Sequence, residues 1–218
     1  PSVRIGIGDV CMWEECDESI TVSVRQMLKE AEDAGMRVMD RSLPEAVEAI
    51  ELLHLGSVVS AECDEFLQAE LPDWRDTLDP FIAARIRDGG SISAGEYLSR
   101  QRRLARIAES AAQRFDGCDV IVSPTVAISP PTVDEVATLE GYRPRNLMSL
   151  RNTCVANSLD LCAVSIPVGL DHNGMPVGMQ MLARNGDEER LWAVAGLMER
   201  RLGDSRRRRG ESPLESGY

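Results

Sequence analysis

The spacing of hydrophobic positions predicts a strand–helix–strand unit at the start of the chain. A helix is expected from Asp17 to about Ala34, because its apolar residues share one face: Ile20, Val24, Met27, Leu28 and Ala31. Short apolar runs on either side, at residues 3–7 and 36–41, predict strands. Two strands joined through one helix lie parallel in a sheet.

Helical patterns dominate the next part of the chain. One begins after Pro44, which fits the first turn of a helix, and continues towards Leu67 with a break expected near Gly56. Two further prolines punctuate the acidic segment that follows, and residues 81–87 predict a short helix.

A capping motif and a buried strand follow. Ser93 and Glu96 fit a capping box, in which the serine oxygen accepts from the first turn and the glutamate reaches back, so a helix is expected from there to about Phe115. Residues 119–122 predict a compact buried strand that ends in a Ser-Pro-Thr sequence. The stretch from there to Leu150 has no clear period and is interpreted as irregular.

Two apolar runs near the C-terminus predict a hairpin. Residues 163–170 and 175–183 are strand-length, and the Asn-Gly pair in the turn between them favours a tight connection. Because both runs are apolar on both faces, we expect the hairpin inside a sheet that helices cover on both sides. Asn185 and Glu188 are expected to cap a last helix with an inward face of Leu191, Val194, Ala195 and Met198.

The order of elements predicts an α/β protein with a mixed β-sheet and helices on both faces. Residues 1–202 are expected to form this α/β unit, and the polar, arginine-rich residues 203–218 are expected to be a disordered tail. The length of 218 residues suits one substantial core.

Composition narrows the class of protein. No apolar stretch approaches the roughly 20 residues that cross a bilayer, so no membrane association is expected. The formal charge of −12 argues against direct nucleic-acid binding. The six cysteines are scattered without a CxxC pair, as in reduced thiols of a cytoplasmic protein.

Familiar active-site motifs are incomplete in this chain. Gly6 and Gly8 lack the third glycine of a dinucleotide fingerprint, and the following helix begins too late to meet a phosphate. The glycine-serine segment 89–95 does not satisfy G-x-S-x-G. Neither histidine, His54 or His172, has an evident carboxylate to orient it in a triad.

The sequence also gives no support for a metal site, a cofactor site or a catalytic thiol. No His/Cys/Asp/Glu cluster has ligand spacing, and no cofactor is expected. Cys154 and Cys162 lack a neighbouring histidine and are interpreted as buried thiols. The single lysine, Lys29, is expected on an exposed helix face.

Several segments resemble the C-terminal half of amidase signature enzymes. These are the opening Val-Arg-Ile-Gly strand, the Ser-Pro-Thr strand end at Ser123, and an asparagine followed by Pro-x-Gly and G-x-P-x-G-x-Q motifs: Asn157, Pro167, Gly169, Gly174, Pro176, Gly178 and Gln180. The resemblance covers nearly the whole chain. The sequence around Asp160 and Cys162 is closer to allophanate hydrolases and related ureide-type amidases than to other family members, which suggests a small, polar, nitrogen-rich substrate. The A subunit of glutamyl-tRNA amidotransferase is another enzyme of this kind.

The resemblance implies hydrolysis of an amide C–N bond through a serine acyl-enzyme. In these enzymes a second serine, on a cis peptide, relays a proton between the nucleophile and a neutral lysine. These residues belong to a Gly/Ser-rich N-terminal half that this chain does not contain, so no catalytic residue is expected here.

The resemblance also implies that this half supplies part of the substrate-pocket wall. The candidates are the Pro-Thr loop and the loop before the hairpin: Ser123, Thr125, Arg151, Thr153, Asn157 and Asp160. An arginine such as Arg151 suits bidentate pairing with a substrate carboxylate. The alternative reading is that these side chains only satisfy loop backbone.

Two hypotheses about the whole protein follow. In the first, the chain is the C-terminal portion of an amidase that acts on a small amide and is completed by an N-terminal amidase half, in the same protein or as a separate chain. In the second, it is a non-catalytic amidase-like protein that serves as a binding or scaffold component. The sequence leaves open whether the chain forms a homo-oligomer.

Overall fold

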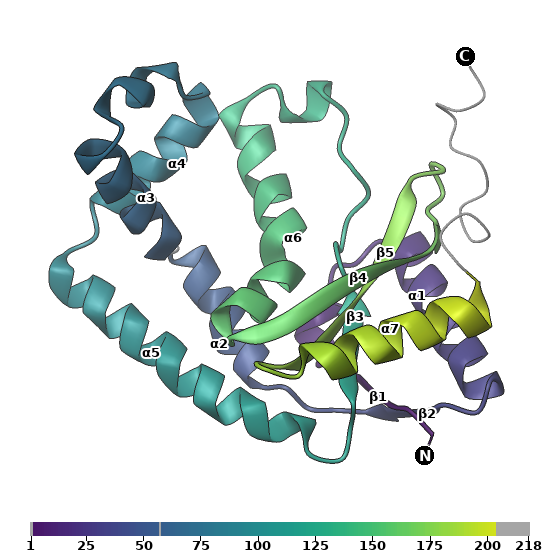
Figure 1. Ribbon diagram of the computed structural model, residues 1–218. Coiled ribbons are helices and arrows are strands. Elements are labelled where there is room, and N and C mark those ends of the chain that lie inside the picture. The colour runs from purple at the N-terminus through teal and green to yellow at the C-terminus, as the bar shows by residue number, and fades with distance from the viewer. Residues whose placement is uncertain (1, 57, 204–218) are drawn as a thin grey trace.

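The computed structural model describes residues 2–56 and 58–203, which fold around a five-stranded sheet with strand order β2-β1-β3-β5-β4 (Figure 1). Its strands are β1 (Arg4–Ile7), β2 (Arg37–Asp40), β3 (Val120–Pro124), β4 (Leu161–Leu170) and β5 (Pro176–Arg184). β1 pairs in parallel with β2 and β3, whereas β5 is antiparallel to both β3 and β4. The parallel strand–helix–strand unit and the mixed sheet are therefore confirmed.

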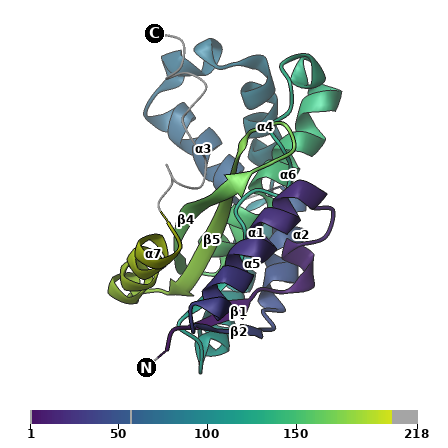
Figure 2. The same ribbon diagram turned by 90° about the vertical axis from the view of Figure 1, so that its right-hand side faces the viewer.

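Helices cover both faces of the sheet, as the α/β prediction required. They are α1 (Glu18–Asp33), α2 (Glu45–His54), α3 (Val58–Ala69), α4 (Pro80–Gly90), α5 (Ala94–Ala112), α6 (Leu139–Ser158) and α7 (Glu188–Leu202). α1 and α7 pack on one face, and α2, α5 and α6 lie on the other. α3 and α4 pack against each other as a helical lobe beside α6 (Figures 1 and 2). None of the described helices combines the length and apolar character that crossing a bilayer requires.

Alternation along the strands divides the hydrophobic interior into two clusters. Met179 and Met181 point to the α1 and α7 side, where the predicted inward residues of α7 are all buried. Leu182 and Ile121 point to the other side and pack with α2, α5 and α6. The side-chain period of two along a strand is what separates these clusters.

Helix termini are only partly as expected. The Ser93 hydroxyl accepts from the Glu96 amide at 3.2 Å, which confirms half of the capping box, while the Glu96 carboxylate pairs with Arg100 instead of reaching back. Asp17 precedes α1 without capping it, because its Oδ2 accepts from the Ser129 amide at 2.6 Å.

The expected cap of the last helix is wrong. Asp187 precedes α7 and makes no side-chain cap bond. The Asn185 amide instead donates to Asp160 Oδ2 at 2.7 Å, which ties the start of the hairpin to its end. The expected tail from residue 203 lies outside the described residues, apart from Gly203 itself.

The main departure from the sequence analysis is α6. The stretch before Leu150 was expected to be irregular, yet helix begins at Leu139, capped by Thr138, whose hydroxyl accepts from the Gly141 amide at 3.2 Å. Pro144 removes one backbone donor inside this helix and obscures its pattern. Its residues also contact several elements rather than one, so no single apolar stripe forms.

The hairpin forms with the expected turn but not in the expected position. Asp171 Oδ1 accepts from the amides of Asn173 and Met175, both at 2.8 Å, and Gly174 has a φ of 77°. β5 lies inside the sheet, whereas β4 ends the strand order. Ala163 and Ser165 are exposed on β4, so this strand is not buried on both faces.

Candidate functional site

Three buried polar residues lie where β3 ends, on the sheet face beneath α6. The Gln180 amide donates to Ser123 Oγ at 2.9 Å and to the Asn152 carbonyl at 3.1 Å. The Asn152 amide donates to the carbonyls of Met12 and Pro124, both at 2.8 Å. Each amide group has used both of its hydrogens, so the cluster fixes α6 against the end of β3.

Thr125, the next residue after β3, lies at the accessible edge of this region. Its Oγ1 is 2.6 Å from Ser165 Oγ on β4, and Gly178 lies directly against the pair. A Cβ at Gly178 would be 2.7 Å from Ser165 Oγ and 2.9 Å from Thr125 Oγ1. Since one hydroxyl donates to the other, the remaining hydrogen is available to a third group.

Arg151 is on α6 rather than in a loop, and it is 5% exposed. Its Nε donates to Asn152 Oδ1 at 3.2 Å, and its Nη1 lies 3.9 Å from Met148 Sδ. Within the described residues its Nη2 has no hydrogen-bond partner. A buried guanidinium with an unpaired nitrogen costs free energy.

The cysteines near Arg151 are poor nucleophiles. Burial raises the pKa of Cys154 to about 12 and that of Cys11 to about 11, although the charge of Arg151 acts to lower both. Both thiols are therefore protonated near neutral pH, in agreement with the interpretation of Cys154 as a buried thiol.

The other predicted residues face two separate hollows. Thr153 and Asn157 lie on α6 rather than in a loop and line a cleft of about 270 Å³. Asn157 and Asp160 line an open depression of about 640 Å³, where Asp160 has a φ of 51°. The six predicted residues thus fall into an inner group (Ser123, Thr125 and Arg151) and an outer group, and they do not meet in one pocket.

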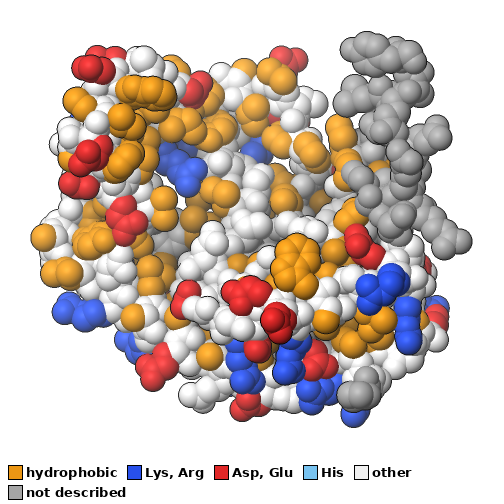
Figure 3. Space-filling model, in the orientation of Figure 1, with side chains coloured by type: hydrophobic (Ala, Val, Ile, Leu, Met, Phe, Trp, Pro, Cys, Tyr) orange, Lys and Arg blue, Asp and Glu red, His pale blue; other side chains and the backbone are white. Residues whose placement is uncertain are grey.

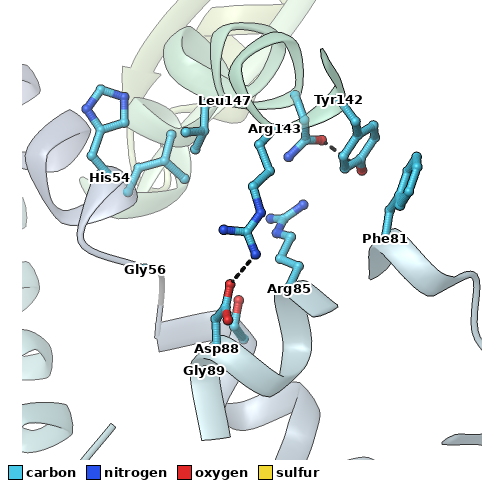
Figure 4. A pocket seen from close by; sticks show the side chains of 12 residues that line it. His54, Gly56, Phe81, Arg85, Asp88, Gly89, Tyr142, Arg143 and Leu147 are labelled. Carbon is cyan, nitrogen blue, oxygen red and sulfur yellow. Dashed lines mark hydrogen bonds and ion pairs between the residues drawn. The ribbon is translucent and has the colours of Figure 1, made fainter. Parts of the chain in front are cut away.

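A second cleft, of about 170 Å³, separates the helical lobe from α6. Phe81, Arg85 and Asp88 enter it from α4, and Tyr142, Arg143 and Asn146 from α6 (Figure 4). Arg85 also lines the 270 Å³ cleft, so the two adjoin, and we call them together the Arg85 cleft. Positive side chains lie recessed between the lobe and α6 with hydrophobic side chains around them (Figure 3).

Two contacts close one side of the Arg85 cleft. Arg143 Nη2 lies 2.8 Å from Asp88 Oδ2, and the rings of Phe81 and Tyr142 have centroids 5.3 Å apart with a 34° tilt. Sequence reasoning missed this site because it interpreted the first half of α6 as irregular. The available signal was the spacing of four between Phe81 and Arg85 and between Tyr142 and Asn146, which places each pair on one helix face.

The motifs that the sequence analysis set aside have structural roles. Gly89 and Gly90 are the last residues of α4, and a Cβ at Gly89 would lie 2.4 Å from backbone of Ser60 on α3. Both histidines are exposed, as is Lys29 on α1. Among the described residues no group of three or more His, Cys, Asp or Glu is placed to hold a metal ion.

Comparison with known proteins identifies the class. The model of the Amidase family matches residues 1–192. A 2-amino-5-chloromuconic acid deaminase from Comamonas testosteroni is 35% identical over 201 residues, which are 92% of this chain and 44% of the relative. A fatty acid amide hydrolase from Medicago truncatula is 32% identical over 177 residues, which are 80% of this chain and 29% of that protein.

A solved structure agrees with these sequence matches. Allophanate hydrolase from Kluyveromyces lactis superposes with a TM-score of 0.76 and 18% identity, over 91% of this chain and 32% of that one. The chain belongs to the amidase family, as its motifs suggested. It spans less than half the length of these relatives.

Proposed function

We propose that this chain is the pocket-forming, C-terminal portion of a hydrolase that breaks the C–N bond of a small substrate. The observation that carries the proposal is the family match over residues 1–192 in a chain that spans only 44% of its 35%-identical relative. The nucleophile, the cis serine and the neutral lysine come from an N-terminal amidase half, in the same polypeptide or as a separate chain.

The character of the lysine supports this division of labour. Lys29, the one lysine of the sequence, is exposed on α1. A general base must be neutral, which in a lysine requires burial. The exposure of Lys29 therefore favours a catalytic lysine that another stretch of polypeptide supplies.

The uncovered side of the sheet supports a neighbouring half. On β4, Ala163 pairs with Leu182 of β5 and Ser165 pairs with Gln180. The two β5 residues are buried, whereas Ala163 and Ser165 are exposed beside α6. An edge strand with an uncovered inner face is a surface that proteins normally protect. We infer that the N-terminal half covers it and meets Thr125 there.

The pocket wall then consists of residues accessible from that side. We propose substrate contact for Thr125, Thr153 and Asn157, and support of the wall for Ser123, Arg151 and Asp160. The 35%-identical relative is named for deamination of 2-amino-5-chloromuconic acid, and by that resemblance we propose a small acyclic substrate that loses ammonia. The free cysteines of the chain are consistent with a cytoplasmic setting.

An assay of ammonia release tests the proposal. The chain is produced alone and together with the N-terminal half, and both samples are incubated with 2-aminomuconate and a panel of small amides. We expect release only from the assembled protein, and co-purification of the two halves. Activity of this chain alone would overturn the division of labour, and an inactive assembly would favour the non-catalytic scaffold role.

A further inference from the structure

We propose that Arg85 recognises the substrate of this protein, and that the substrate carries a carboxylate on a flat, unsaturated skeleton. The inference rests on the proposed function, because the Arg85 cleft also contains Thr153 and Asn157, two of the proposed substrate contacts. It is carried by the charge balance and the shape of the Arg85 cleft.

Arg85 is the cleft arginine without a counter-charge. It extends from α4 into the space between α4 and α6, where Arg143 approaches it from the opposite helix (Figure 4). Arg143 is neutralised by Asp88 at 2.8 Å. Arg85, which is half-buried, makes no ion pair or hydrogen bond within residues 2–56 and 58–203. The lining therefore keeps one uncompensated positive charge.

A carboxylate is the ligand that best matches this charge. The guanidinium is always protonated, and its planar fork binds two carboxylate oxygens in parallel. Its partial burial removes water that would otherwise weaken the pair. The whole chain has a formal charge of −12, so most of its surface repels anions. A recessed positive site therefore directs an anion to the cleft.

The remaining walls favour a flat skeleton. Phe81 and Tyr142 form one apolar side, and Leu53 and Leu147 line the other parts of the cleft. The Tyr142 hydroxyl donates to Asn146 Oδ1 at 3.3 Å, which leaves the Asn146 amide nitrogen as a donor for a ligand. One aromatic wall and two polar groups, Arg85 and Asn146, suit a short conjugated acid with a second polar group.

Arg85 meets this role better than Arg151. The Arg151 side chain is only 5% exposed and its Nη2 is fully enclosed, so it does not open onto either part of the Arg85 cleft. Arg85 lines both parts of the cleft and is open to each. The carboxylate-binding role that the sequence suggested for an arginine is thereby assigned to α4.

Direct binding tests the inference independently of catalysis. cis,cis-Muconate and its uncharged diamide are titrated by calorimetry into the assembled protein, or into this chain if no other half co-purifies. We expect muconate to bind and the diamide to bind at least about tenfold more weakly, since a bidentate charged contact is lost.

Variants of two arginines on the same helix localise the effect. Arg85→Met keeps the length of the side chain and removes its charge, and we expect it to weaken muconate binding at least about tenfold. Arg85→Lys should fall between the two, because it retains the charge without the fork. Arg87→Met is the matched control, since Arg87 is exposed on α4 and does not line the cleft, and it should bind as the parent does.

The outcomes separate the two proposals. Muconate binding that depends on Arg85 supports the inference, even if the assembly hydrolyses nothing and the proposed function fails. Hydrolysis of neutral amides with muconate binding that is absent, or unchanged in a correctly folded Arg85→Met variant, overturns the inference and leaves the proposed function intact. Equal losses in Arg85→Met and Arg87→Met would also overturn it.

Discussion

The Gln180 amide reaches from β5 to the neighbouring β3 and donates to Ser123 Oγ, 2.9 Å away, in the buried layer beneath α6. The same amide group holds the carbonyl of Asn152, so one side chain connects β5, β3 and α6. These two hydrogen bonds explain what the glutamine at the end of the G-x-P-x-G-x-Q motif contributes to the fold. It satisfies buried polar atoms that water cannot reach.

Replacing this glutamine is expected to destabilise the fold. Gln180→Leu leaves the Ser123 hydroxyl and the Asn152 carbonyl without their buried donor, at a cost of about 2–4 kcal/mol in the free energy of unfolding. Urea denaturation measures the change. Gln26→Leu, at an exposed position on α1, is the control and should change stability by less than about 0.5 kcal/mol. Similar values for both variants would contradict the role of Gln180.

Gly178 is expected to tolerate no side chain while both neighbouring hydroxyls are present. Gly178→Ala places a methyl group within 3 Å of Ser165 Oγ and Thr125 Oγ1, and about 1–3 kcal/mol of stability should be lost. Adding Ser165→Ala removes the closest of these atoms and should restore part of the loss. Gly95→Ala on α5, where the nearest atom is 4.0 Å away, should be neutral or stabilising. A double variant no more stable than Gly178→Ala would contradict the steric explanation.

Glu45 is expected to make stability depend on acid pH. Burial raises the pKa of its carboxyl, but hydrogen bonds from Arg114 and Ser110 outweigh this and leave the pKa below its usual range. Because the folded-state pKa is lowered, the contribution is complete above the unfolded-state value and is lost as pH falls through the folded-state value.

The comparison of Glu45→Gln with the parent measures this contribution. The difference in unfolding free energy should be largest at pH 6–7 and should shrink below roughly pH 4.5. Glu109→Gln, at an exposed position on α5, serves as control and should follow the parent at every pH. A Glu45→Gln difference that stays constant down to pH 3 would count against the lowered pKa.

The thiol of Cys154 is expected to resist alkylation. With a pKa raised to about 12 by burial, only a very small fraction is thiolate at pH 8. Iodoacetamide at pH 8 should leave Cys154 unmodified in the folded protein and modify it in urea, as peptide mass spectrometry can establish. Rapid labelling of folded protein would show that the thiol is activated.

The sequence predicted those parts of the fold in which hydrophobic residues recur at a regular local spacing. α1, α7 and the hairpin turn carry their own signals, and the buried residues of both helices are the expected ones. α6 does not carry such a signal, because Pro144 interrupts it and its surroundings differ from turn to turn. The sequence also did not reveal that β4 lies at the edge of the sheet. Its apolar composition predicts burial but does not say whether this chain or a neighbouring one would bury the strand.

The candidate site was predictable only where motifs mark it. Ser123, Thr125 and Asn157 stand in or beside family motifs, which is why the sequence nominates them, and their roles stay predictions. Arg85 lies among mostly apolar residues of α4, and its role in the cleft depends on Tyr142 and Arg143, which are more than fifty residues away along the chain. A site assembled from two distant helices has no sequence signature of its own.

The described residues of the helical lobe contribute nothing to either buried cluster around the sheet, although they supply Phe81, Arg85 and Asp88 to the cleft. Selection can therefore alter α3 and α4 with little thermodynamic penalty elsewhere in the molecule. In such an architecture, substitutions in α3 and α4 can change what the cleft binds without disturbing the packing around the sheet.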